Sequence, residues 1–165
     1  MFTMSYVVPA STRVGHIHLK VSDLDKALPF YQDLLGFQIT ARFGSSAVFL
    51  SAGGYHHHIG LNTWHSKNAS PAPVNSCGLY HTAILYAERK ELATILQRLI
   101  EANYPLTGAA DHGVSEAIYL NDPDGNGIEL YWDKPREQWI FDADNNLQMV
   151  TEHLNIRSLL AEIGK

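Results

Sequence analysis

The stretch Tyr119-Leu120-Asn121-Asp122-Pro123-Asp124-Gly125-Asn126-Gly127-Ile128-Glu129 contains two strand-like runs joined by a dense turn. If the turn centres on Asp124, antiparallel pairing places Tyr119 opposite Glu129. Directly paired side chains have Cβ atoms about 4.5–5.5 Å apart and share one face of the sheet. The sequence therefore predicts a hairpin that holds a tyrosine beside a glutamate.

The two faces of this hairpin differ in chemistry. One predicted face is apolar and should pack on a helix; it consists of Ile118, Leu120, Ile128 and Leu130. The other face consists of Ala117, Tyr119, Glu129 and Tyr131. A lone carboxylate on this second, concave face is costly unless a cation or strong hydrogen-bond donors meet it.

Upstream, a strand followed by an amphipathic helix occurs twice. The run Val14–Val21 alternates apolar and polar residues, and apolar residues then recur at helical spacing from Leu24 to Leu35, where Gly36 ends the pattern. The run Leu79–Tyr86 again resembles a strand, and Leu92–Ile100 carries the apolar stripe of a second helix. This repeat indicates two similar modules.

Shorter strands complete each module. They are expected at 38–43, 47–51 and 56–62 in the first module, and near 106, at 114–120 and at 127–132 in the second. We expect one domain spanning 1–165, with modules at about 14–65 and 78–133, a linker at 66–76, and a tail at 134–165 that acts as a lid or a dimer contact. The expected fold class is α+β, with two βαβββ modules that form a half-open mixed β-barrel around a metal site.

Composition narrows the possible partners. The chain has 165 residues, 45% of them hydrophobic and 18% charged, with a formal net charge of −5. It lacks the basic patch that binding to nucleic acid requires. No apolar run approaches the roughly 20 residues of a membrane span. Cys77 is the single cysteine, and the N-terminus does not resemble a signal peptide, so we expect a cytoplasmic protein.

Three residues are candidate metal ligands. His16 and His81 lie near the starts of equivalent strands, and Glu129 lies on the hairpin. Two imidazoles and one carboxylate leave coordination positions open for substrate and oxygen, as in non-haem iron enzymes. Taken singly, a histidine at the start of a strand is more often a hydrogen-bonded or exposed residue. As a set, the three residues predict an enzyme with a metal site.

The chain resembles the vicinal-oxygen-chelate superfamily over about residues 14 to 133. The motifs that carry the resemblance are Gly15-His16, Ser22-Asp23-Leu24, Phe30-Tyr31, Leu35-Gly36-Phe37, Tyr80-His81 and Asp122-Pro123-Asp124-Gly125-Asn126-Gly127-Ile128-Glu129. This superfamily includes glyoxalase I, extradiol dioxygenases, fosfomycin-resistance transferases and bleomycin-binding proteins. Its metal ligands fall on His16, His81 and Glu129.

Within the superfamily, the chain most resembles catechol 2,3-dioxygenase-like proteins, because of the runs His56-His57-His58-Ile59-Gly60-Leu61-Asn62-Thr63-Trp64 and Asp111-His112-Gly113-Val114. The resemblance implies iron(II), with manganese, nickel or zinc as other possible metals, and a small aromatic substrate together with O2. It also implies a homodimer. The implied acid–base groups are His57, Tyr119 and, at a shorter spacing than in the family, His112.

Several further side chains are expected on the substrate side of the site. They are His18, His58, Trp64 and Tyr131. Ordinary core packing explains the aromatic residues among them equally well, and His57 is favoured over His58 as the acid–base group. A histidine of the 56–58 run is also a candidate fourth metal ligand, as in glyoxalase-like relatives.

Two other functions stay open at this point. A glyoxalase-like isomerase or lyase would use nickel or zinc, whereas a binding protein of the bleomycin-resistance kind would use no metal. The intact set of His16, His81 and Glu129 favours an enzyme over a binder. Fosfomycin transfer is disfavoured because no clear basic cluster for a phosphonate accompanies these residues.

Overall fold

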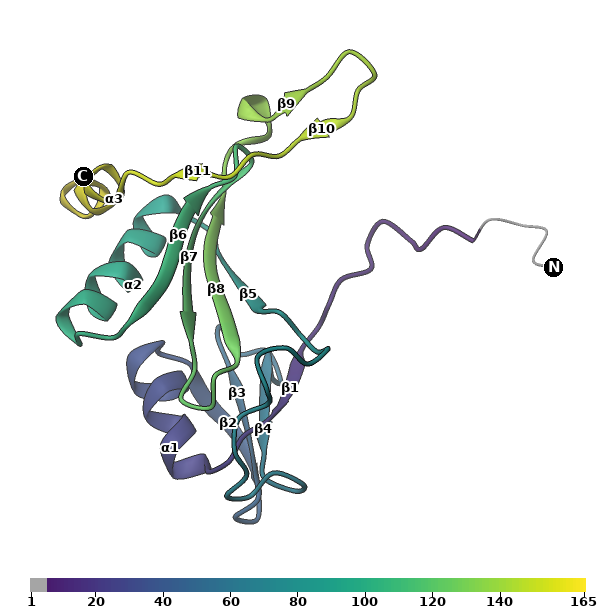
Figure 1. Cartoon of the computed structure of the whole chain (residues 1–165), viewed down its shortest axis with the longest axis vertical. Coiled ribbons are helices and arrows are strands. Elements are labelled where there is room, and N and C mark those ends of the chain that lie inside the picture. Colours follow the sequence, from purple (N-terminus) through teal and green to yellow (C-terminus); the bar gives the residue numbers. More distant parts are fainter. Residues whose placement is uncertain (1–5) are drawn as a thin grey trace.

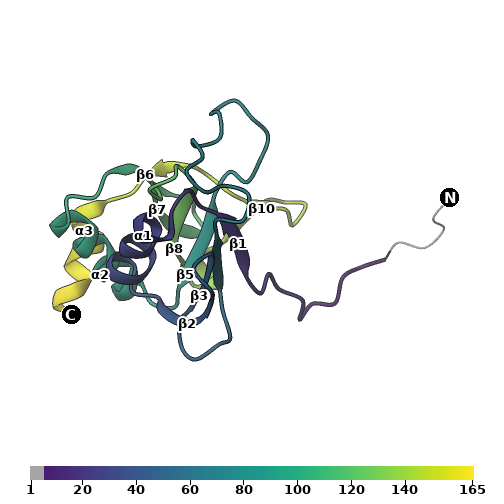
Figure 2. The same cartoon turned by 90° about the horizontal axis from the view of Figure 1, so that it is seen from below.

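The computed structural model describes residues 6–165. It has the expected α+β class, with the strands of the two modules in two separate sheets and the helices on one side of them (Figures 1 and 2). The elements of the first module are β1 (Ile17–Lys20), α1 (Leu24–Leu28), a π-helix (Pro29–Leu34), β2 (Gln38–Phe43), β3 (Ala47–Ser51) and β4 (Ile59–Asn62). Its sheet has the order β1-β4-β3-β2, with β1 parallel to β4.

The second module repeats this plan. Its elements are β5 (Thr82–Tyr86), α2 (Arg89–Glu101), β6 (Leu106–Asp111), β7 (Ser115–Asn121) and β8 (Gly127–Asp133). The sheet order is β11-β6-β7-β8-β5, where β11 comes from the C-terminal tail. Strands β5 and β8 are parallel, as β1 and β4 are in the first module, so the predicted repeat is confirmed.

The first predicted helix is interrupted. The α-helix of α1 gives way at Pro29 to a π-helical turn, in which the Leu35 N–H donates to the Phe30 carbonyl. Proline lacks the N–H that an α-helix needs at this point. The wider turn buries the adjacent side chains of Phe30 and Tyr31 together, which a regular helical stripe would not predict.

One apolar core joins the two modules. Phe30 packs on Tyr104 with ring centroids 5.1 Å apart, and the Tyr31 hydroxyl donates to Asp122 in the β7–β8 turn at 2.8 Å. Asp124 in the same turn accepts hydrogen bonds from the backbone and side chain of Ser22. The turn that precedes Glu129 is therefore docked on the first module.

The expected barrel does not close in this chain. Strands β1 and β5 are the outer strands of their sheets, and no ladder between them is present in the described residues. Several strands are also shorter than predicted: β1 begins at Ile17, β4 at Ile59 and β5 at Thr82. His16, His56–His58 and His81 consequently lie in the segments that lead into strands, because alternating side chains alone do not show where pairing begins.

The tail at 134–165, for which the sequence predicted no strands, contains several short elements. It forms a 3₁₀ turn (Arg136–Gln138), a hairpin of β9 (Ile140–Phe141) and β10 (Leu147–Gln148), β11 (Glu152–His153), α3 (Ile156–Leu160) and a final 3₁₀ turn (Ala161–Gly164). The hairpin projects from the body, whereas α3 lies against α2 (Figure 1). Within the described residues, no helix has the length and apolarity needed to cross a bilayer.

Candidate active site

The β7–β8 hairpin places Tyr119 directly opposite Glu129, in the register predicted from its turn. The Tyr119 hydroxyl donates to Glu129 Oε1 at 2.9 Å. Ile118, Leu120, Ile128 and Leu130 are almost fully buried on the other face, as expected. This apolar face fixes the hairpin on the helices and thereby holds the Glu129 carboxylate, whose side chain is 13% exposed.

His81 is brought to the same carboxylate by the parallel pairing of β5 with β8. Its Nε2 lies 3.0 Å from Glu129 Oε2. Gly127 permits this approach, since a Cβ at that position would overlap the Tyr80 carbonyl and lie 3.2 Å from the His81 Cβ. Of the three predicted metal ligands, His81 and Glu129 thus meet within the chain.

His112 extends this group on the far side of Tyr119. Its Nε2 lies 2.6 Å from the Tyr119 hydroxyl, and its Nδ1 lies 2.9 Å from the Val150 carbonyl oxygen in the tail. Burial, together with the hydrogen bond to Glu129, raises the pKa of Tyr119, so the phenol stays protonated at neutral pH. A polar chain therefore runs from the tail through His112, Tyr119 and Glu129 to His81, and we call it the proton chain.

His16 lies in a second group, in the first module. Its ring is 4.4 Å from that of His57, and the His57 ring is 5.0 Å from Phe49. Nδ1 of His57 is 2.7 Å from Nδ1 of His56. Desolvation and the surrounding histidines lower the pKa of His57, which favours its neutral form. The predicted acid–base histidine thus adjoins the predicted ligand His16.

Two of the predicted substrate-side residues join this group. His18 contacts Trp64 edge-on at 5.4 Å and Phe49 at 5.7 Å, and burial lowers its pKa. Gly60 makes room for the His18 ring, because a Cβ there would lie 2.8 Å from Cδ2 of that ring. An aromatic and imidazole surface therefore surrounds His57.

The other two predicted substrate-side residues differ in setting. His58 has a local role: its Nδ1 lies 3.0 Å from the Ser51 hydroxyl and accepts from the Ala52 N–H at 3.3 Å. Tyr131 lies on the same face as Glu129, two residue pairs along the β7–β8 ladder from it. Burial raises the pKa of Tyr131.

The two groups do not form one metal site within a single chain. Across residues 6–165, no three His, Cys, Asp or Glu side chains converge closely enough to hold an ion. Between the modules lies a groove of about 660 Å³. It is lined on one side by Val14–Ile17 and on the other by Thr82–Ala87.

The His81–Glu129 pair nevertheless has the spacing of two metal ligands. Donor atoms about 2.1 Å from a metal and at right angles to each other lie about 3 Å apart, and the Nε2–Oε2 distance is 3.0 Å. The other His81 nitrogen, Nδ1, is buried and has no hydrogen-bond partner among the described residues. Two of the three expected ligands, His81 and Glu129, therefore fit a metal ion. The third, His16, does not reach them within the described part of one chain.

Sequence reasoning missed the tail's contribution. Val150 contacts His112 through a backbone carbonyl, which every residue carries, so no side-chain pattern could reveal it. The ion pair of Arg89 was also missed. A cation at the N-terminus of a helix is unfavourable unless a carboxylate pairs with it, and this was a signal in the sequence. The partner of Arg89 is Glu116, whose side chain is buried.

Comparison with known proteins assigns these features to a family. Residues 13–130 match the model of the Glyoxalase/Bleomycin resistance protein/Dioxygenase superfamily. The chain is 41% identical over 154 residues to a catechol-2,3-dioxygenase of Bacillus subtilis, covering 93% of this chain and 53% of that protein. It is 30% identical to the metallothiol transferase FosB of Staphylococcus epidermidis, covering 73% and 81% of the two chains.

Solved structures agree on the fold. A glyoxalase/dioxygenase from Nostoc punctiforme superposes with a TM-score of 0.63 at 19% identity, covering 80% of this chain and 99% of that one. The chain spans about half the length of the Bacillus protein, so that protein has a further segment of similar size. The family match ends at residue 130, before the tail that contacts His112.

Proposed function

This chain belongs to the glyoxalase/bleomycin resistance protein/dioxygenase superfamily, and on that premise we propose that it is an iron(II)-dependent extradiol-type dioxygenase that opens the ring of a small catechol-like aromatic. The observation that carries the proposal is the convergence of His81 Nε2 and Glu129 Oε2 to 3.0 Å, with Tyr119 and His112 directly behind them. The similarity to the Bacillus catechol-2,3-dioxygenase supports the same reaction.

We propose a homodimer in which His16 of one copy completes the ligand pair of the other. Strands β1 and β5 are the outer strands of their sheets, and each is preceded by one of the histidines in question. The exposed apolar residues along these edges include Val14, Tyr80 and Leu85, which are 86%, 90% and 53% exposed. Exposed apolar surface of this kind marks an interaction site.

In this arrangement each polar group has a distinct task. Bound iron(II) would supply the coordination positions for a catecholate and O2. His57, held neutral beside His16, accepts a proton from the incoming catechol. Tyr119 donates a hydrogen bond toward oxygen atoms that gain negative charge, and it stays protonated because its pKa is raised. His18, Trp64 and Tyr131 surround the aromatic ring.

The FosB similarity supports a second candidate, metallothiol transfer. A phosphonate substrate requires cationic side chains near the metal. Within the described residues, the side-chain partners of Glu129 and Tyr119 are His81 and His112 and each other, with no lysine or arginine among them, which does not suit such an anion. An isomerase of the glyoxalase kind would be indicated by nickel or zinc in place of iron.

The proposal is tested by oxygen uptake. Protein reconstituted anaerobically with iron(II) should consume one O2 for each catechol opened, and the yellow ring-opened product should appear at the same rate. His57→Gln should bind iron and lose turnover, whereas the exposed His65→Gln serves as the matched control. Iron-loaded protein that consumes no oxygen with any simple catechol would contradict the proposal.

A further inference from the structure

The C-terminal tail lies directly against His112. Strand β11 extends the second sheet by pairing with β6, with Glu152 opposite Asp111. Immediately beyond this ladder, the Val150 N–H donates to the His112 carbonyl at 3.1 Å, and His112 Nδ1 lies 2.9 Å from the Val150 carbonyl oxygen. His112 is therefore joined to Val150 through both its backbone and its ring.

The contact with a carbonyl determines where the ring carries a proton. A backbone carbonyl oxygen can only accept a hydrogen bond, so Nδ1 of His112 must be the donor. The Thr151 hydroxyl lies farther from this nitrogen, at 3.4 Å. The other nitrogen, Nε2, lies 2.6 Å from the Tyr119 hydroxyl. This hydroxyl has a single proton, which it can donate either to Glu129 Oε1 or to an unprotonated Nε2. Nε2 is therefore the nitrogen of His112 that faces the proton chain.

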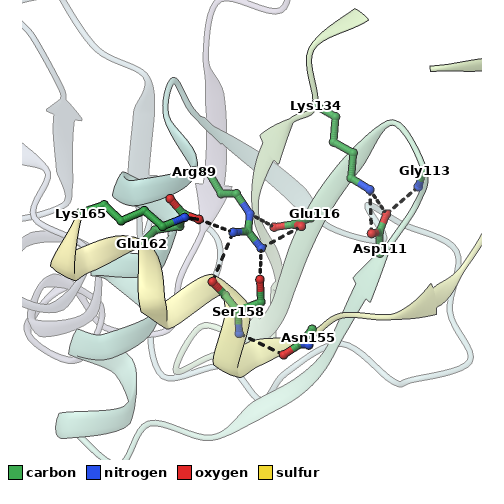
Figure 3. Close-up of polar contacts among 9 residues, drawn as sticks. All are labelled: Arg89, Asp111, Gly113, Glu116, Lys134, Asn155, Ser158, Glu162 and Lys165. Carbon is green, nitrogen blue, oxygen red and sulfur yellow. Dashed lines mark hydrogen bonds and ion pairs between the residues drawn. The ribbon is translucent and has the colours of Figure 1, made fainter. Parts of the chain in front are cut away.

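Two ion pairs hold the tail on either side of this contact (Figure 3). At the start of the tail, Lys134 Nζ lies 2.7 Å from both carboxylate oxygens of Asp111, which also accepts from the Gly113 N–H. Asp111 and Gly113 are the residues on each side of His112. The first ion pair thus fixes the backbone of the loop that carries this histidine.

The second ion pair fixes the end of the tail. Arg89 donates to both oxygens of the buried Glu116 and, from its other terminal nitrogen, to Glu162 at 2.8 Å (Figure 3). Leu154 and Leu159 of the tail are fully buried in the core. The segment that contains Val150 is consequently held in place on both sides, although it lies beyond residues 13–130, which the family model matches.

We propose that Val150 is a positioning residue, whose carbonyl keeps the His112 proton on Nδ1 and directs Nε2 toward Tyr119. The tail is then a part of the active site, although it places no side chain there. The catalytic consequence rests on the proposed dioxygenase function, but the position of the proton does not. A histidine with its proton on the wrong nitrogen can lose most of its catalytic effect.

Nitrogen-15 NMR of the full chain, loaded with diamagnetic zinc, tests the proposal directly. His112 is assigned by the loss of its signal in His112→Gln, at a pH above about 8, where an ordinary imidazole is neutral. We expect a protonated Nδ1 and an unprotonated Nε2. A protonated Nε2 beside an unprotonated Nδ1 in the unmodified chain would overturn the proposal.

A pair of variants separates the backbone contact from the side chain. Val150→Pro removes the N–H that donates to His112 and displaces the carbonyl, whereas Val150→Ala keeps both backbone groups. We expect the Nδ1-protonated form to persist in Val150→Ala and to mix with the Nε2-protonated form in Val150→Pro. If the two folded variants gave the same His112 spectrum, the Val150 carbonyl would have no positioning role.

Kinetics supply the second readout. With a catechol substrate, Val150→Pro should lower kcat about tenfold or more relative to Val150→Ala, with KM changed less than about twofold because no substrate contact is removed. Equal kcat values would reject the catalytic consequence. If the chain turns over no catechol at all, the dioxygenase proposal fails, while the NMR result still decides the position of the proton.

Discussion

Among single residues, Tyr119 connects His112 with Glu129 through its hydroxyl. Its hydroxyl has one proton and lies within hydrogen-bond distance of Glu129 Oε1 and His112 Nε2. The Tyr119–Glu129 pairing followed from the symmetry of the turn in the sequence. The His112 contact did not, because it depends on the shape of the loop at Gly113, where φ is +77°.

Tyr119→Phe should preserve the metal and reduce turnover. The substitution keeps the ring in the ladder and removes only the hydroxyl, so His81 and Glu129 keep their positions. We expect kcat to fall by about 10²-fold, the scale of one proton-transfer group, with iron content unchanged. Tyr104→Phe, which removes a hydroxyl on the exposed side of the fold, is the control. Unchanged turnover in Tyr119→Phe would remove this tyrosine from the mechanism.

Asp111 should make stability depend on pH in the acid range. Burial opposes its ionisation, but hydrogen bonds from Lys134 and the Gly113 N–H outweigh that effect and hold the pKa of Asp111 below its usual value. A depressed folded-state pKa stabilises the fold above the unfolded-state pKa, near 4, and this contribution is lost as the pH falls through the folded-state value.

The measurement is urea unfolding of the native chain and Asp111→Asn from pH 3 to pH 7. The difference in their free energies of unfolding should be constant above about pH 5 and shrink below about pH 4. Glu137→Gln, at an exposed carboxylate, should show no such change. A difference that stayed constant throughout would contradict the assigned role of the Lys134 pair.

At the scale of elements, the β7–β8 turn is the link between the modules. The carboxylate of Asp122 accepts from the backbone N–H groups of Asp124 and Asn126, from the Asn126 side chain, and from the Tyr31 hydroxyl. The hairpin and its register were predictable, since turn residues and alternation are local signals. The π-helix that buries Tyr31 was not, because Pro29 indicates only that the α-helix is interrupted and not which turn follows.

Tyr31→Phe should loosen this link. The substitution keeps the buried ring but takes one hydrogen bond from a buried carboxylate, which costs about 1.5–3 kcal/mol for a bond to a charged group. Tyr104→Phe removes a hydrogen bond to a neutral carbonyl and should cost about 1 kcal/mol. Chemical denaturation measures both. Equal losses in the two variants would show that Asp122 does not depend on the Tyr31 hydroxyl.

At the scale of the whole molecule, the two groups of candidate site residues lie on two sheets that do not close on each other. Alternation of apolar and polar residues specifies each sheet, its faces and much of its register. It does not specify how one sheet meets another. From the sequence, His16 was grouped with His81 and Glu129, whereas the described part of a single chain does not bring the three side chains together. In the proposed homodimer, a second copy of the chain supplies the missing ligand.

Complementation of two inactive variants tests this arrangement. His16→Ala and Glu129→Ala each lack one ligand, but a mixed dimer of the two would contain one complete site if ligands are shared between chains. Random co-refolding makes about half of the dimers mixed, so about one quarter of the native iron and activity should return. Sites formed within single chains would give no recovery in the mixture.

The central claim is that Glu129 is a metal ligand of an iron enzyme. The most direct measurement is elemental analysis of protein purified without a chelating tag, for the native chain and for Glu129→Ala, with folding of both checked by circular dichroism. The account predicts iron near one per native chain and its loss in Glu129→Ala. A native chain without metal, or a folded variant that retains its full metal content, would contradict it.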